Sequence, residues 1–292
     1  MDQGITPLIS IAMNEGLFTE SFHSIESVSP LLLSLVVFVF GSVLGSFLNV
    51  CIVRLPNKES IVKPPSHCPN CKARIPFYDN IPLISYLFLC GRCRFCKERI
   101  SPRYFFVELL TGILAVALLF RFGLSPAFFV NLVFVAALVV VSFIDLDAWI
   151  IPDLISLPGI GIGFLASVVQ YPWPTDSLAI PPTPMSSFIG ILIGGGFLWL
   201  VAIIYELFTG AEGMGGGDVK LLAMIGAFLG WPSILLTLFF GSLIGAAIGV
   251  VLMLKAGADA KHPIPFGPFL CLGAVIYLFF GREVVQFYLP AG

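Results

Sequence analysis

Charged side chains are scarce in this sequence. Only 11% of its 292 residues are Asp, Glu, Lys or Arg, whereas 58% are hydrophobic. A soluble globular domain carries roughly a quarter charged residues, so this shortage excludes an ordinary soluble domain. The apolar residues also come in blocks of roughly 20, the length that an α-helix needs to cross a bilayer. The sequence therefore predicts an integral membrane protein.

Basic residues are missing from positions 1–30, which hold four acids. A secretory signal peptide begins with a basic segment, so we expect the first apolar span to be retained. Ten of the fifteen Lys and Arg lie between Arg54 and Arg103, where only three acids oppose them and leave a charge near +7. Loops rich in Lys and Arg stay on the cytoplasmic side of a membrane. The charge pattern predicts a cytoplasmic loop and an N-terminus outside.

Apolar runs and helix breakers predict an all-α integral membrane protein with about eight transmembrane helices. We expect an outer N-terminal segment (1–30), a first helix (31–53), the basic loop (54–103), a transmembrane core (104–281) and an outer C-terminal tail (282–292). Within the core, short loops are expected at 146–152 and at Trp231-Pro232. Alternating the spans from the outer N-terminus also puts the C-terminus outside the inner membrane.

Two acids lie at the ends of apolar runs, where charged groups are costly and usually functional. Asp145 closes the run that begins at Val139, and Asp218 follows the glycine-rich segment 213–217. Alternation of the spans places both acids at the cytoplasmic face. Two carboxyl groups on different helices can share one proton, so that one activates water while the other polarises a peptide carbonyl. The glycines beside Asp218 allow the backbone of an unwound substrate to approach closely.

Each acid alone also has an ordinary explanation. Asp145 can be an interfacial carboxylate that reaches the headgroups, and Asp218 can be a charge favoured at a helix N-terminus. Asp153, in the run Ile151-Pro152-Asp153, is interpreted as the start of a helix. The residues alone leave these explanations open.

Two CxxC pairs lie in the basic loop, Cys68–Cys71 and Cys93–Cys96. Their spacing, C-x2-C-x21-C-x2-C, is close to that of a zinc ribbon with four thiolate ligands. A reducing cytoplasm favours metal binding over disulfides. Four protein ligands leave no open coordination position, so the predicted zinc is structural. Cys51, Cys90 and Cys271 are expected to be buried small apolar residues, with Cys90 a weaker rival ligand.

The first apolar span carries small residues at helical spacing. Gly41 and Gly45 form a face on which another helix can pack closely. Asn49, near the cytoplasmic end of the same span, is expected to bond to a neighbouring element. Helix packing alone explains this motif.

Together these features resemble the prepilin peptidases, also called type IV leader peptidases. The resemblance extends in order from about residue 40 to 270. Its matching stretches are 45–50 and 54–56, both CxxC pairs, 80–86, Arg103-Tyr104, Glu108-Leu109, Ile144-Asp145, 151–153, 213–222 and 263–268. The joint pattern is more specific than any of its parts.

The resemblance implies an aspartyl peptidase with a GxGD motif, here residues 215–218, in which Asp145 and Asp218 are catalytic. Its substrates would be membrane-anchored prepilins of type IV pili and pseudopilins of type II secretion, cut on the cytoplasmic side after a Gly. The new N-terminal residue, usually Phe, would then be methylated with S-adenosylmethionine as donor. The loop is associated with methylation, and Gly91 matches its motif glycine. Supporting roles for substrate and loop are implied for Gly215, Gly216, Gly217 and Lys220.

Four other functions are compatible with parts of the sequence. They are a peptidase without methylation, a proton- or cation-coupled transporter, a non-enzymatic assembly factor and a protease that cuts within the bilayer. Proton relays need polar groups at mid-membrane depth, and the third to fifth spans are poor in them. Both acids lie near a surface, which disfavours cleavage within the bilayer. The expected partners are therefore pilin-like substrates and lipid, with no nucleic acid.

Overall fold

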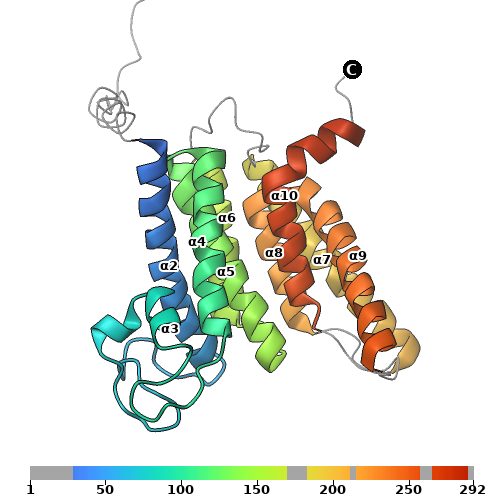
Figure 1. The fold of residues 1–292 in the computed structure, drawn as a ribbon. Helices are drawn as coiled ribbons and strands as arrows, with labels where there is room; N and C mark the ends of the chain where they lie inside the picture. The colour runs from blue at the N-terminus through green and yellow to red at the C-terminus, as the bar shows by residue number, and fades with distance from the viewer. Residues whose placement is uncertain (1–28, 170–182, 211–214, 257–264, 289–292) are drawn as a thin grey trace, which may run out of the picture.

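The computed structural model describes residues 29–169, 183–210, 215–256 and 265–288, which form a bundle of helices (Figure 1). In chain order the helices are α2 (Pro30–Arg54), η1 (Phe77–Asn80), α3 (Ile84–Phe88), α4 (Arg103–Phe122), α5 (Pro126–Ala148), α6 (Asp153–Val168), α7 (Pro184–Thr209), α8 (Gly216–Leu229), α9 (Trp231–Ala256) and α10 (Gly267–Tyr288). The described residues contain no β-strand, only two isolated bridges in the loop before α4. The expected all-α fold is confirmed.

Five helices are long and apolar enough to cross a membrane: α2, α4, α5, α7 and α9. Helix α6 and the apolar part of α10 are shorter, and α8 has only 14 residues. Five of the eight expected spans therefore meet the length of a membrane crossing. The expected outer segment 1–30 lies outside the described residues except for its last two positions.

Local sequence signals set the starts of three helices. Ser29, Ser125 and Thr183 precede α2, α5 and α7, and each side chain accepts the backbone N–H three residues further on. Such a cap satisfies a donor that the first turn leaves unpaired. A proline follows each cap, where its missing N–H has no consequence. These three helix starts therefore follow from the sequence.

The predicted positions of two loops are wrong. The chain turns at Gly230 (φ +78), so Trp231 and Pro232 form the first turn of α9 and not a separate turn. Helix α5 continues beyond Asp145 to Ala148, so the loop that we expected at 146–152 is shorter. The added turn carries Asp147, which forms an ion pair with Arg103 at the start of α4.

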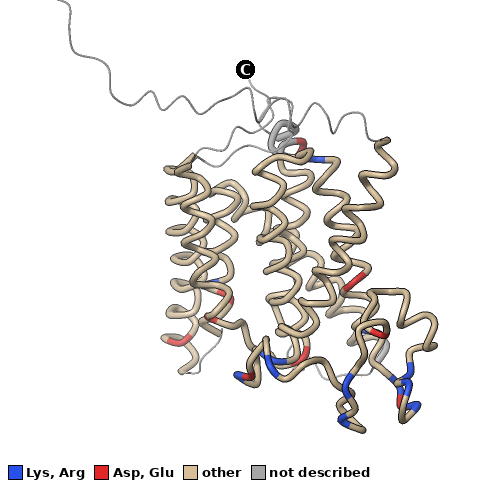
Figure 2. Tube along the Cα trace, turned by 90° about the vertical axis from the view of Figure 1, so that its left-hand side faces the viewer, with Lys and Arg blue, Asp and Glu red and all other residues tan. Residues whose placement is uncertain are grey.

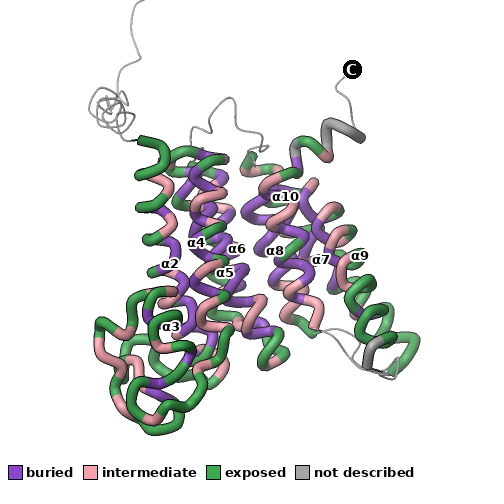
Figure 3. The backbone as a smooth tube through the Cα atoms, viewed as in Figure 1, coloured by how far each residue is buried: buried purple, intermediate pink, exposed green. Residues whose placement is uncertain are grey.

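The buried core centres on α5 and α8 (Figure 3). Every residue of α8 from Leu221 to Leu229 is buried. Helices α6, α7, α9 and α10 all pack against α8. A helix that is apolar on all sides needs such an enclosed position. The neighbouring helices, and not lipid, therefore surround this short segment.

Helices α2 and α4 approach each other through the predicted small-residue face. A Cβ at Gly41 would lie 2.7 Å from the Cβ of Ala115, and one at Gly45 would lie 2.8 Å from the α4 backbone. The Asn49 side chain, 1% exposed, donates to the carbonyl oxygen of Tyr104 at 3.1 Å. The predicted packing role of the glycines and the predicted bond of Asn49 are both confirmed.

Most of the charged residues lie toward one end of the bundle, with a few at the other end (Figure 2). The loop between α2 and α4, the last turn of α5 and the first turn of α8 all lie at this end (Figure 1). The fold thus brings the basic loop and the two acid-bearing helix ends to the same end of the molecule.

We expect Gly45→Val to lower the melting temperature of the purified protein in detergent. The added side chain would overlap the α4 backbone, and overpacking typically destabilises by about 1–3 kcal/mol. Gly161→Val in α6 is the matched control, because a Cβ there meets nothing within 4 Å. Equal shifts in the two variants would contradict the packing role of Gly45.

Candidate functional site

Asp145 lies in the last turn of α5 and is 6% exposed. Its Oδ2 accepts a hydrogen bond of 3.0 Å from the backbone N–H of Gly267, the first residue of α10. A Cβ at Gly267 would lie 2.6 Å from that oxygen. A side chain at Gly267 would therefore displace the carboxylate that its N–H binds.

Asp218 lies in the first turn of α8. Its Oδ1 is buried and has no hydrogen-bond partner within the described ranges. The carboxyl groups of Asp218 and Asp145 lie within electrostatic range of each other. Both carboxyl groups also lie within electrostatic range of the buried Cys271 thiol, one turn into α10. The structure thus brings together the two acids that the sequence singled out.

Ile151 packs between the backbones that carry the two acids. It is 9% exposed and lies in the loop between α5 and α6. A Cβ at Gly217 would lie 2.9 Å from the Cβ of Ile151, and a Cβ at Gly267 would lie 3.3 Å from its Cδ1. Because Gly217, the residue before Asp218, has no side chain, the start of α8 can approach this loop closely. Gly215 and Gly216 are exposed and have no such close neighbour.

Lys220 forms a contact that sequence reasoning missed. Its Nζ lies 2.7 and 2.9 Å from the two carboxylate oxygens of Asp153. Asp153 occupies the first turn of α6, as expected. Both side chains are more than one-third exposed, so the pair contributes at most about 1 kcal/mol. Its effect is to join the start of α6 to the helix that carries Asp218.

The four thiols of the CxxC pairs lie within 4.8 Å of one another. Four cysteines in this arrangement can hold one metal ion with tetrahedral geometry. Hydrogen bonds from the backbone N–H groups of Cys96 and Phe95 lower the pKa of the Cys93 thiol to about 7. Cys71 in the same cluster shifts the other way: against a backbone hydrogen bond from Ala73, burial and the neighbouring thiols raise its pKa to about 11, so without a metal the thiols share their protons unequally. The predicted ligands therefore come together in the described loop.

The two halves of this cysteine cluster repeat one backbone turn. In each half, the N–H of the first cysteine donates to the carbonyl oxygen five residues further on, at 2.9 Å. The residue after the second cysteine has a positive φ in both halves, 58° at Lys72 and 59° at Lys97. The sequence analysis missed this repeat, although the pattern C-x-x-C-K-x-R-I occurs at both 68–75 and 93–100.

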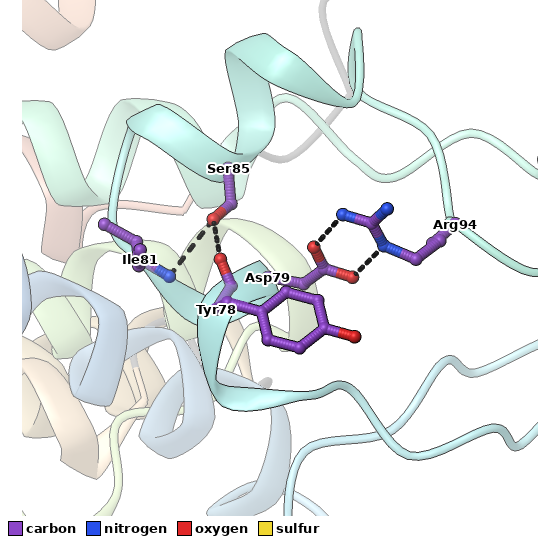
Figure 4. Close-up of polar contacts among 5 residues, drawn as sticks. All are labelled: Tyr78, Asp79, Ile81, Ser85 and Arg94. Carbon is purple, nitrogen blue, oxygen red and sulfur yellow. Dashed lines mark hydrogen bonds and ion pairs between the residues drawn. The ribbon is translucent and has the colours of Figure 1, made fainter.

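Polar contacts connect η1 and α3 to the second half of the cluster (Figure 4). Arg94 binds Asp79 through two hydrogen bonds, Nε to Oδ2 at 2.6 Å and Nη2 to Oδ1 at 2.5 Å. The same guanidinium lies over the Tyr78 ring and lowers the pKa of the Asp79 carboxyl. The Ser85 hydroxyl donates to the Tyr78 carbonyl oxygen and accepts from the Ile81 N–H. These contacts stabilise the loop around the cysteines.

Gly91 lies between α3 and the second cysteine pair, with a φ of +65. A Cβ at this position would lie 2.8 Å from the hydroxyl oxygen of Tyr86. That hydroxyl donates to the carbonyl oxygen of Ile100 at 3.2 Å. Gly91 therefore sets the shape of the loop, since a side chain would strain the backbone and displace Tyr86.

Cys90 departs from its expected place. It is exposed, in a backbone conformation with a φ of 49°, and it lies outside the group of four thiols. It is therefore neither a buried apolar residue nor a member of the cluster. Cys51 and Cys271 are buried, as expected.

The loop is fastened to α2 and α4 by buried charged side chains. Glu108, 8% exposed, accepts the N–H of Leu83 at 2.8 Å. Leu83 has a φ of +62, a conformation that apolar residues rarely adopt. Arg54 donates to the carbonyl oxygens of Ser60 and Pro64 at 2.8 and 2.6 Å. These bonds fix the first part and the middle of the loop to the bundle.

A membrane-type helix bundle with two carboxyl groups within electrostatic range at one end has the arrangement expected of a membrane-embedded aspartyl peptidase. Residues 39–122 match the family model of the bacterial peptidase A24 N-terminal domain. Residues 132–250, which include both acids, match that of the type IV leader peptidase family. The chain belongs to the type IV leader peptidase family.

Relatives cover almost the whole chain. It is 36% identical to a prepilin leader peptidase/N-methyltransferase of Aeromonas hydrophila, over 89% of this chain and 95% of that protein. It is 35% identical to the protein of the same name from Pseudomonas aeruginosa, over 89% and 94%. The corresponding Xanthomonas campestris protein is 37% identical, over 85% and 92%. No solved structure matches the chain.

Proposed function

We propose that this chain cleaves the basic leader of type IV prepilins and type II secretion pseudopilins after a Gly, and then N-methylates the new N-terminal residue. The observation that supports this most is that Asp145 and Asp218, from different helices, lie within electrostatic range of each other at the end of the bundle that carries the basic loop. The names of the relatives supply both activities.

Cleavage follows from two carboxyl groups that share one proton. The ionised group takes a proton from water, whose oxygen attacks the scissile carbonyl carbon. The protonated group gives its proton to the carbonyl oxygen, and a gem-diol forms. The first group then returns its proton to the peptide nitrogen while the C–N bond breaks, and a hydroxyl proton restores the second group. Water and the peptide bond are the only reactants consumed.

The charge pattern supports the orientation of the protein in the inner membrane. We place the basic loop and both acids on the cytoplasmic side, with both termini outside. The exposed Gly215 and Gly216 lie next to Asp218 and leave room for an extended substrate backbone. A substrate that stays anchored in the bilayer would then present its leader beside the acids.

The cysteine cluster fits a structural Zn²⁺. Four thiols within 4.8 Å of one another supply a complete tetrahedral ligand set, which leaves no position for a reacting group. When bound, the metal would supply only a crosslink between the two halves of the loop. Cys68, Cys71, Cys93 and Cys96 are the proposed ligands.

For the second activity we propose S-adenosylmethionine as methyl donor, bound by the loop. Exposed rings of the loop, Phe77, Phe88 and Phe95, can stack against an adenine. When bound, the donor would supply the methyl group, and the loop residues would orient the substrate amine. Gly91 supports this activity by setting the loop shape. No observation favours the transporter or the peptidase without methylation.

We expect Asp145→Ala and Asp218→Ala each to reduce leader cleavage by roughly 10⁴-fold, because each removes one proton carrier. The substrate is a membrane-anchored peptide with a basic leader, Gly, Phe and an apolar helix, and mass spectrometry measures the products. Asp147→Ala is the matched control, since this acid lies half-exposed on the same helix. Normal cleavage by either test variant would refute the acid pair.

We expect Cys68→Ser combined with Cys71→Ser to lose bound zinc, measured by elemental analysis of the purified protein. Half of the ligand set would be gone, and the loop should become sensitive to limited proteolysis. Cys90→Ser is the control, because this exposed thiol lies outside the cluster. An unchanged zinc content in the double variant would rule out the four-thiolate site.

We expect Gly91→Ala to reduce methyl transfer at least about tenfold while leader cleavage changes less than about twofold, consistent with a misplacement confined to the loop. The added methyl displaces Tyr86, but the acids lie on other helices. Mass spectrometry of one reaction measures the shortened peptide and its methyl gain together. A parallel loss of both activities would contradict the separation of the two sites.

A further inference from the structure

We propose that the backbone N–H of Gly267 holds Asp145 as the ionised, water-activating member of the acid pair, which makes Asp218 the protonated member. This inference rests on the proposed function, because it divides the roles within the same pair. Gly267 lies beyond residues 132–250, which match the peptidase family model, but within the stretch 263–268 that contributes to the family resemblance. It acts here as a positioning residue through its backbone.

The two acids differ in their hydrogen bonds. Oδ2 of Asp145 accepts the Gly267 N–H at 3.0 Å. Oδ1 of Asp218 is buried without a partner within the described ranges. An N–H donor stabilises a carboxylate, whereas a buried oxygen without a donor disfavours the charged form. The single negative charge of the pair is therefore better accommodated on Asp145.

Helix dipoles do not reverse this difference. The last turn of α5 disfavours a negative charge on Asp145, but the first residue of α10 faces the same carboxylate and favours it. These two effects oppose each other. Asp218 gains only from the first turn of its own helix, α8. A direct hydrogen bond to an ionised group is worth more than such a dipole effect.

Among the described residues, no other charged group near the pair favours one acid over the other, so the Gly267 N–H is the contact that distinguishes Asp145 from Asp218. Asp145 faces Asp218 from α8 and the Cys271 thiol from α10, and that thiol bonds to Ser142 of α5. Lys220, two positions after Asp218, pairs with Asp153, and Arg103 pairs with Asp147, which lies two positions after Asp145. In the described part of the chain, no ion pair stabilises Asp145 or Asp218.

The assignment gives each proton transfer a direction. Water gives its proton to Asp145 as its oxygen attacks the scissile carbonyl carbon, and Asp218 gives its proton to the carbonyl oxygen. Asp145 then passes its proton to the peptide nitrogen as the C–N bond breaks. A gem-diol hydroxyl returns a proton to Asp218 as the carboxylic acid product forms. Both acids end in their starting states.

The first arm of the test compares Asp145→Asn with Asp218→Asn on the membrane-anchored leader peptide. An amide cannot accept the proton of water, so we expect Asp145→Asn to lose about 10⁴-fold in kcat. At position 218 an amide still donates a hydrogen bond to the carbonyl oxygen, so we expect a loss nearer about 10²-fold. The higher residual kcat of Asp218→Asn is the diagnostic result.

The second arm probes Gly267 itself. In Gly267→Ala the new methyl would displace the Asp145 carboxylate, so kcat should fall about 10²-fold with KM unchanged. Gly245→Ala is the matched control, because its methyl would crowd Phe269 in the first turn of α10 at 3.2 Å. We expect this control to keep both kinetic constants within about twofold, since no hydrogen bond to a reacting group changes.

Each outcome separates this inference from the proposed function. Equally reduced kcat in the two Asn variants, or a higher value for Asp145→Asn than for Asp218→Asn, would overturn the assignment but leave the acid pair in place. A normal kcat in Gly267→Ala would overturn the positioning role. If Gly267→Ala does not fold, the comparison of the Asn variants decides the assignment alone. Full activity of both Asn variants would refute the peptidase function itself.

Discussion

The hydrogen bond between Asp145 and the N–H of Gly267 is the interaction on which the site depends. A carboxyl group inside an apolar helix bundle loses its hydration, and only a small number of polar partners can replace it. Here the partner is a backbone group at the first residue of a helix, which has no partner within that helix. The site therefore needs α5 and α10 to meet at their ends with no side chain between them.

Close helix packing satisfies this need throughout the bundle. A Cβ at Gly226 of α8 would lie 2.2 Å from the carbonyl oxygen of Gly190 in α7. Gly217 and Gly267 allow the same closeness around Ile151, between the two acids. Small residues serve this purpose in membranes, where apolar burial drives helix association less than in water. The geometry of the candidate site is thus a local case of the packing rule that holds the whole bundle together.

The sequence predicted what local patterns encode. Apolar runs predicted the order of the helices, and the two acids were singled out because they lie at the ends of such runs. Caps such as Ser125-Pro126 mark helix starts. Contacts between distant segments were not predictable. Nothing in the local sequence indicates that Gly267 meets Asp145, 122 positions away, or that Lys220 pairs with Asp153. The repeated cysteine turn was readable in the sequence and was overlooked.

Two units of the structure carry the two proposed activities. The loop is bonded to α2 and α4 through Arg54 and Glu108, whereas the acids are positioned by α5, α8 and α10. The family models divide the chain in the same way, into residues 39–122 and 132–250. The ion pair of Arg103 with Asp147 connects the start of α4 to the last turn of α5. Under the proposed function, a substrate cut beside the acids would have the loop at the same end of the bundle, which suits two consecutive reactions on one membrane-anchored chain.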